Sequence, residues 1–129
     1  MNPKILIIDD DEELCMELSE LLKEEGYEVK SSHDGLEGLS TLKENNYDLL
    51  LLDLKIPGMN GFDVLKNVKN SKPLLKVIVI SGRPVFNQLK KYTGNYDEEE
   101  ENILKMADGI ISKPFDVTRV LGKISELMA

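Results

Sequence analysis

The sequence predicts an α/β fold in which five parallel strands form a doubly wound sheet and alternate with five helices. Short aliphatic runs, several without polar alternation, are typical of strands buried on both faces of a parallel sheet. Segments with apolar residues at helical spacing follow these runs. The two patterns alternate through 129 residues without an internal repeat, a low-complexity segment or a linker. We therefore expect one domain that covers residues 1–129.

The first strand–helix unit begins near the N-terminus. Residues 4–8, Lys-Ile-Leu-Ile-Ile, predict a strand that ends in three acids, Asp9, Asp10 and Asp11. Leucines then recur at helical spacing as far as Gly26, and glutamates occupy the other faces. Asp11 suits the N-cap of this helix, because its side chain can accept a hydrogen bond from a free backbone amide.

The next two units are centred on a run of leucines. Residues 27–31 predict the second strand, and Asp34 opens a helix that closes near two asparagines. The third strand, 49–52, consists of four consecutive leucines and predicts burial on both faces. The leucines lead directly into Asp53, and a third helix begins near Gly61. In open α/β sheets, ligands bind at the carboxyl ends of strands, so Asp53 is well placed for chemistry.

The last two units are separated by a segment without clear periodicity. Residues 76–80 are largely β-branched and predict the fourth strand. Residues 83–96 predict an irregular loop with no more than one helical turn, and the acid run from 97 leads into a fourth helix that ends near 106. A short fifth strand, 109–112, and a turn precede a final amphipathic helix, whose apolar residues extend to Leu127. Asp116 suits its N-cap.

Composition excludes several function classes. The net charge of −8 argues against nucleic acid as a direct partner, because phosphate backbones require a basic face. No apolar run approaches the ~18 residues that a membrane span needs. The single cysteine, Cys15, fits a reducing compartment, and the N-terminus does not resemble a signal peptide. We expect a cytoplasmic protein that binds a cation or basic partner surfaces.

The common strand order for a sheet of this size, 2-1-3-4-5, brings the candidate site residues together. It places Asp9 and Asp10 beside Asp53, with Ser81 and Lys113 at the ends of the next two strands. Two carboxylates about 4 Å apart repel by roughly 4 kcal/mol at an effective dielectric of about 20, so three of them need a cation. Oxygen ligands without clustered His or Cys select Mg²⁺ or Ca²⁺, and a cage with few protein ligands favours Mg²⁺.

A carboxylate beside Mg²⁺ can attack phosphorus and form an aspartyl phosphate, while a lysine and a hydroxyl hold the other phosphoryl oxygens. Asp53, Lys113 and Ser81 match these roles. Each residue also has an ordinary interpretation: the acids after the first strand could only cap a helix, Ser81 could be a turn residue, and Lys113 could lie in a plain loop. Their joint occurrence in one register favours a site.

The combination resembles the receiver domain of two-component response regulators, which has a flavodoxin-like fold. The resemblance rests on the acid pair after the first strand, the lone Asp53 after the third, Ser81 and Gly82 after the fourth, and Lys-Pro-Phe from Lys113. These motifs occur in the family's order and span essentially the whole chain. No single motif is specific, but the set is.

The resemblance implies a role for each matching residue. Asp53 would be the phosphoacceptor, and Asp10 and Asp53 would bind Mg²⁺ directly. Asp9 would hold the ion through water, and Lys55 would offer its backbone carbonyl. The donor would be a phosphohistidine on a sensor histidine kinase or a phosphotransfer protein. The chain would assist its own phosphorylation without being an enzyme that turns over an outside substrate.

The resemblance also predicts how phosphorylation is transmitted. The Ser81 hydroxyl would follow the phosphoryl group, and Lys113 would pair first with Asp53 and then with the phosphate. The bond between Lys113 and Pro114 would be cis. Homodimerisation is expected through the face formed by the fourth helix, the fifth strand and the fifth helix.

Three features depart from the family's pattern. Ile110 occupies the position three residues before the lysine, where receivers usually carry an aromatic switch residue. The interval between Ser81 and Lys113 is longer than receivers usually show, and the extra residues fall in the predicted irregular loop. Lys55 and Arg83 lie two residues beyond Asp53 and Ser81, positions that influence the lifetime of the acyl phosphate. Two long basic side chains there predict slow dephosphorylation.

Two other function classes use a related architecture. A Mg²⁺-dependent phosphohydrolase would need an Asp-x-Asp motif, but Lys55 replaces its second acid. A flavodoxin-like cofactor binder would need a phosphate loop after the first strand, where the acidic triplet would repel phosphate. The sequence leaves open whether the chain acts as a stand-alone receiver or belongs to a larger regulator, because the final helix is followed by little more than Ala129.

Overall fold

The computed structural model describes residues 2–82 and 98–129; Arg83 and the predicted irregular loop at 83–96 lie outside the described residues. The elements alternate between strand and helix as the sequence predicts. In chain order they are β1 (Lys4–Ile8), α1 (Glu12–Glu24), β2 (Glu28–Ser32), α2 (Gly35–Glu44), β3 (Leu49–Asp53), α3 (Gly61–Ser71), β4 (Lys76–Ser81), α5 (Glu98–Leu104), β5 (Gly109–Ser112) and α6 (Val117–Met128).

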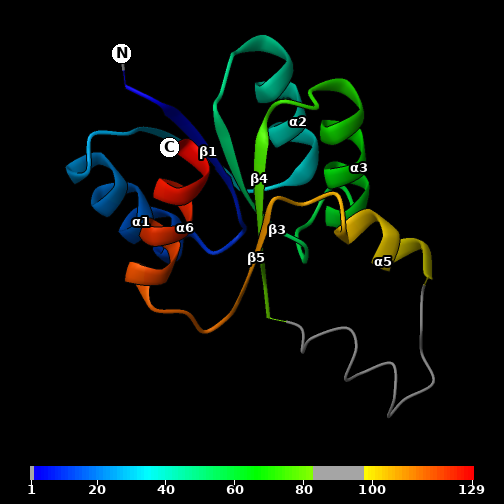
Figure 1. The fold of residues 1–129 in the computed structure, drawn as a ribbon. Coiled ribbons are helices and arrows are strands. Elements are labelled where there is room, and N and C mark those ends of the chain that lie inside the picture. Colours follow the sequence, from blue (N-terminus) through cyan, green and yellow to red (C-terminus); the bar gives the residue numbers. More distant parts are fainter. Residues whose placement is uncertain (1, 83–97) are drawn as a thin grey trace.

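The five strands form one parallel sheet in the order β2-β1-β3-β4-β5, which confirms the predicted fold class. Figure 1 shows α1 and α6 against one face of the sheet and α2, α3 and α5 against the other. Because all strands are parallel, their carboxyl ends lie at the same edge of the sheet. β1 and β3 are direct neighbours in the centre, and their ends carry the predicted acids.

Strands β3 and β4 each extend one residue beyond the predicted end. Asp53 pairs with Ile80 in the ladder between β3 and β4, and Ser81 pairs with Ser112 in the ladder between β4 and β5. Apolar patterning ends at the last aliphatic residue, whereas the hydrogen-bonded ladder continues into the polar residue that follows. Both predicted site residues therefore belong to the sheet itself.

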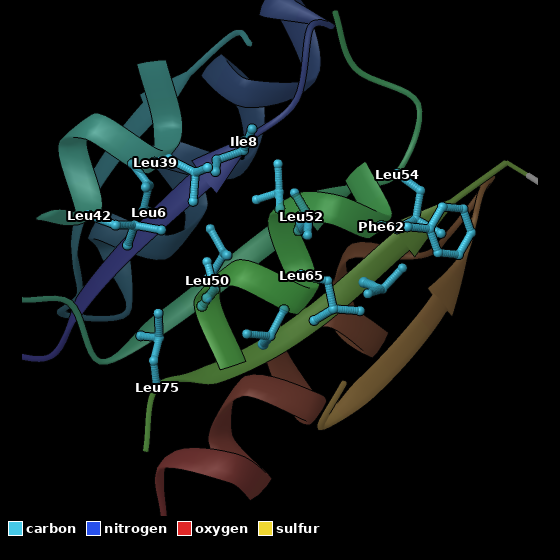
Figure 2. Close-up of a cluster of buried hydrophobic side chains, with 14 of the residues drawn as sticks. Leu6, Ile8, Leu39, Leu42, Leu50, Leu52, Leu54, Phe62, Leu65 and Leu75 are labelled. Carbon is cyan, nitrogen blue, oxygen red and sulfur yellow. The ribbon is translucent and has the colours of Figure 1, made fainter. Parts of the chain in front are cut away.

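The core lies on both faces of the central strand β3. Leu50 and Leu52 pack with α2 and α3 in the cluster of Figure 2, whereas Leu49 and Leu51 face the cluster that contains residues of α1 and α6. All four leucines have 0% exposure, which confirms the prediction from the unbroken leucine run. Each leucine buried in this way stabilises the fold by about 1.5–3 kcal/mol relative to an exposed side chain.

Short polar side chains fix where the helices begin. The side chains of Asp11, Asp34 and Asp116 accept hydrogen bonds from backbone amides in the first turns of α1, α2 and α6. Asn60 does the same for α3. The two predicted caps, Asp11 and Asp116, are confirmed. Among the described ranges, no helix combines the length and apolar character needed to cross a membrane.

The connection between β3 and α3 folds back tightly on itself. The Gly61 amide donates to the carbonyl oxygen of Leu54 at 3.2 Å. A Cβ added to Gly61 would lie 2.4 Å from both the Cα and the carbonyl oxygen of Leu54, which is much closer than van der Waals contact. Gly58 has a φ of 84°, a left-handed conformation that suits glycine. The residues that follow Asp53 are thus held by close backbone packing.

Gly61→Ala should destabilise the fold by about 1–3 kcal/mol, because backbone atoms of Leu54 cannot rotate away from the added methyl group. Gly122→Ala is the matched control in α6, where an added Cβ meets nothing within 4 Å. The control should stabilise the protein by about 0.5–1 kcal/mol, since alanine restricts the unfolded chain more than glycine. Urea unfolding measures both changes; equal effects of the two substitutions would contradict the packing argument.

Candidate functional site

Three carboxylates converge at the carboxyl edge of the sheet. Asp9 and Asp10 follow β1 directly, and Asp53 is the last residue of β3. One carboxylate oxygen from each of the three lies within 4.8 Å of the others. The structure thus brings together the acids that the sequence placed at neighbouring strand ends.

The three acids differ in their exposure to solvent. Asp9 is 1% exposed and Asp53 is 6% exposed, so both are buried among the core residues of the sheet, whereas Asp10 is exposed. Burial of two like-charged groups side by side is unfavourable unless positive charge or hydrogen bonds compensate. The partners of Asp9 and Asp53 provide part of this compensation.

Lys113 bridges the two buried carboxylates. Its Nζ lies 2.9 Å from Oδ2 of Asp9 and 3.2 Å from Oδ2 of Asp53. The Lys113 backbone amide donates to the carbonyl oxygen of Ser81 at 2.7 Å, and the bond to Pro114 is cis, the isomer that the resemblance implies. Sequence reasoning anticipated the pair with Asp53 but not the shorter contact with Asp9.

Backbone amides hold the remaining carboxylate oxygens. Oδ1 of Asp9 accepts a hydrogen bond from the amide of Asp11 at 2.9 Å, and Oδ1 of Asp53 accepts one from the amide of Lys55 at 3.1 Å. Each buried carboxylate therefore contacts lysine with one oxygen and an amide two residues along the chain with the other. These paired contacts fix the orientation of both carboxylates.

The pKa values show how incomplete the charge compensation is. Burial raises the pKa of Asp53, and the negative charge of Asp9 raises it further. The hydrogen bond from the Lys55 amide and the contact with Lys113 lower it, but the net change is a rise. Burial by itself would lower the pKa of Lys113, but its hydrogen bond with Asp9 and the charges of Asp53 and Asp9 raise it overall. The lysine stays protonated, yet one ammonium group does not balance three carboxylates.

The donor set fits a hard divalent cation. The cluster offers only carboxylate oxygens from Asp9, Asp10 and Asp53, without histidine or thiolate. Three carboxylates and one lysine leave a local excess of negative charge, which a divalent ion would neutralise. Mg²⁺ prefers this chemistry and retains water molecules, so the exposed side of the site at Asp10 suits it.

The other predicted site residues lie at different positions around this cluster. Ser81 is a partly buried residue at the carboxyl end of β4, and Lys55 is an exposed residue just after β3. Ile110 lies in β5 with 49% of its surface exposed, so its side chain does not fill the core. Arg83 lies outside the described residues. Ser81 and Lys55 thus belong to the same edge as Asp53.

Cys15 contacts the site from behind, which the sequence did not indicate. Its Sγ–H donates to the backbone carbonyl oxygen of Asp9 at 3.4 Å from the buried face of α1. Burial, followed by the charges of Asp9 and Asp11, raises the pKa of Cys15 to about 12. The thiol is therefore protonated and acts as a weak donor and a packing group. Its spacing of three and seven residues before Leu18 and Leu22, the other buried residues of α1, is the sequence feature that places it inward.

A protein-family model and the sequences of known proteins both match nearly the whole chain. The model of the family described as response regulator receiver domain matches residues 5–125. Sporulation initiation phosphotransferase F of Bacillus subtilis is 31% identical over 99% of this chain and 95% of its own length. Regulatory protein VanRB of Enterococcus faecalis is 32% identical over 99% of this chain, which spans 53% of that protein.

Solved structures with the same architecture are also similar in sequence. The CheY-like receiver domain protein from Methanospirillum hungatei JF-1 superimposes with a TM-score of 0.82 at 30% identity, covering 98% of this chain and 93% of that one. Response regulator TrrA from Thermotoga maritima, solved in complex with Mg(2+)-BeF, gives a TM-score of 0.78 at 28% identity, covering 97% of this chain and 98% of that one.

Mg²⁺ should stabilise the folded chain through the acid cluster. At a concentration about 100 times the Kd, a ligand that binds only the folded state adds about 2.7 kcal/mol to the free energy of unfolding. Asp10→Asn should remove most of this gain without disturbing the buried ion pairs, because Asp10 is exposed. Glu44→Gln, at the end of α2, should retain it. Chemical denaturation with and without Mg²⁺ measures the difference, and an undiminished gain in Asp10→Asn would exclude this cluster as the binding site.

Proposed function

Because this chain belongs to the response regulator receiver domain family, we propose that Asp53 accepts a phosphoryl group from a phosphohistidine of a sensor histidine kinase or phosphotransfer protein. Phosphorylation then switches partner binding or dimerisation. The observation that carries this proposal is the geometry around Asp53: a buried carboxylate paired with Lys113 and within 4.8 Å of two further acids. The chain acts as a phosphoacceptor that assists its own modification.

The transfer step uses Asp53 as a nucleophile. An oxygen of its carboxylate forms a bond to phosphorus while the bond from phosphorus to the histidine nitrogen breaks, and the electron pair of that bond leaves on the imidazole. The raised pKa of Asp53 reflects an incompletely compensated carboxylate, which is a better nucleophile once ionised. Asp53 is held for attack by the Lys55 amide and by its place in β3.

Lys113 and Ser81 bind the transferred group. The Lys113 ammonium already contacts Asp53, so a small displacement lets it pair with a phosphoryl oxygen while Asp9 retains its other contact. The Ser81 hydroxyl, at the carboxyl end of the neighbouring strand, donates to another phosphoryl oxygen. Both groups stabilise charge that develops as the phosphoryl group arrives.

Receiver domains as a family bind Mg²⁺ at their acidic site, and we assign the same role to this cluster. Asp10, Asp53 and the backbone carbonyl of Lys55 would contact the ion. Asp9 would contact it through water, as the resemblance to the family implies. When bound, the ion neutralises charge on the transferring phosphoryl group.

The surface formed by α5, β5 and α6 is the proposed homodimer interface. Two large apolar side chains on or near this surface are solvent-exposed, Ile110 at 49% and Met106 at 38%. Apolar groups at these positions would be buried if two copies met there. Since the chain spans about half of VanRB, the expectation that nucleic acid is not a direct partner applies to this segment.

Incubation with Mg²⁺ and acetyl phosphate should add one phosphoryl group per chain, and Asp53→Asn should abolish the addition. Asp48→Asn is the matched control, because Asp48 precedes the same strand that Asp53 ends. Intact-mass spectrometry measures incorporation. Continuous release of phosphate would instead indicate a phosphohydrolase, and labelling that persists in Asp53→Asn would rule out this phosphoacceptor.

Lys55→Ala should shorten the lifetime of the phosphorylated form by about two- to fivefold, because an exposed basic side chain two residues beyond Asp53 shields the phosphoryl group from water. Lys43→Ala, at the end of α2, should leave the lifetime unchanged. Loss of the added mass over time gives both rates. If the wild type loses its phosphoryl group quickly and Lys55→Ala loses it more slowly, the proposed role of Lys55 is contradicted.

A further inference from the structure

Strand β5 carries Lys113 to the site with little support of its own. It has four residues and, among residues 2–82 and 98–129, lies at the edge of the sheet and pairs only with β4. Ile111 is its one fully buried side chain, at 1% exposure, while Ile110 is half-exposed. A strand with a single buried residue has a weakly specified register, because the backbone ladder forms equally well in several alignments. A slip of two residues would keep Ile111 on the same face and move Lys113 by about 7 Å.

Asp108, directly before β5, ties the start of this strand to β4. Its backbone amide donates to the carbonyl oxygen of Val77 at 2.8 Å, and its Oδ2 accepts from the amide of Val77 at 2.8 Å. The same Oδ2 accepts from Nζ of Lys69 in α3 at 3.0 Å. Unlike the ladder bonds of β5, the two bonds to Oδ2 require a side-chain oxygen at this position, so they favour one register.

Lys69 is satisfied within this arrangement. Besides Asp108, its ammonium group donates to the carbonyl oxygens of Pro73 at 3.3 Å and Leu75 at 3.0 Å, and its side chain is 15% exposed. Three donors thus meet three acceptors on the α3–β4 connection and the start of β5. Burial would raise the pKa of Asp108, but the Val77 amide and Lys69 lower it overall, so this carboxylate is ionised at neutral pH.

We propose that Lys69 and Asp108 are positioning residues for the phosphorylation of Asp53, which hold β5 in the register that delivers Lys113 to the buried carboxylates. The inference rests on the proposed function. This register determines the contacts at the opposite end of β5. Ser112 pairs with Ser81, and the Lys113 amide donates to the carbonyl oxygen of Ser81. Nζ of Lys113 then contacts the carboxylates of Asp9 and Asp53. Neither Lys69 nor Asp108 belongs to the acid cluster.

Loosening this anchor should affect the transfer step more than folding. A displacement of about 1 Å in a group that contacts the reacting atoms can slow a reaction by up to about a hundredfold. Lys69→Met, Asp108→Ala and the double variant should each lower the rate of labelling by acetyl phosphate by about tenfold. The double variant should be no slower than the slower single variant, because both residues act through one anchor.

The experiment compares these variants with Ile5→Val under conditions where every protein is folded. Ile5 is buried in β1, which does not contact β5 in the sheet, and this substitution removes stability without touching the anchor. It should label at the wild-type rate. Hydrogen exchange should accelerate at the amides of Ile111 and Lys113 in the anchor variants, and not at the amides of Leu50 and Leu52 in β3.

The outcomes separate this inference from the proposed function. A wild type that is not labelled overturns the proposed function and this inference with it. If the wild type is labelled but the anchor variants label at the same rate, this inference alone is overturned. It is also overturned if hydrogen exchange in the anchor variants rises equally in β3 and β5. The pair of Lys69 and Asp108 would then have a purely structural role. Slow labelling together with exchange confined to β5 supports it.

Discussion

The interaction on which the site depends is the sharing of one ammonium group by two buried carboxylates. Lys113 lies 2.9 Å from Asp9 and 3.2 Å from Asp53, and the two acids are 1% and 6% exposed. A lysine between them makes their burial possible, but the pKa of Asp53 still rises because burial outweighs the compensation. The site therefore retains an excess of negative charge, which a divalent ion can neutralise.

The scaffold supports the members of this group unequally. Asp9 and Asp53 follow or end the two central strands, whose side chains are buried on both faces by helices. Lys113 extends from the edge strand β5, which contributes one fully buried side chain. Asp53 thus ends a strand that is buried on both faces, while Lys113 follows a strand whose start is tied to its neighbours by the polar contacts of Asp108. Under the proposed function, the group that would pass from the Asp53 carboxylate to a phosphoryl oxygen therefore lies on the less constrained element.

Membership of the receiver family accounts for the fold and for the residue types at the site, but this chain has its own features. Ile110 exposes 49% of its surface on β5, at the position where receivers usually carry an aromatic switch residue. An aliphatic side chain has no ring to bury, so the aromatic part of the family's switch has no counterpart at this position. Lys55 adds an exposed basic residue two positions after Asp53.

From the sequence alone it was possible to predict the alternation of strands and helices, the burial of the leucine run and the candidate site residues Asp9, Asp10, Asp53 and Lys113, which the structure brings close together. These features follow from local periodicity and from residue types at strand ends, which can be recognised without knowing which distant residues are in contact. The folded structure was needed to find that Lys113 contacts Asp9, 104 positions away in the chain, and that Lys69 pairs with Asp108 at the start of β5. Such contacts depend on strand register and helix packing, which are set by many weak interactions at once and leave no short pattern in the chain.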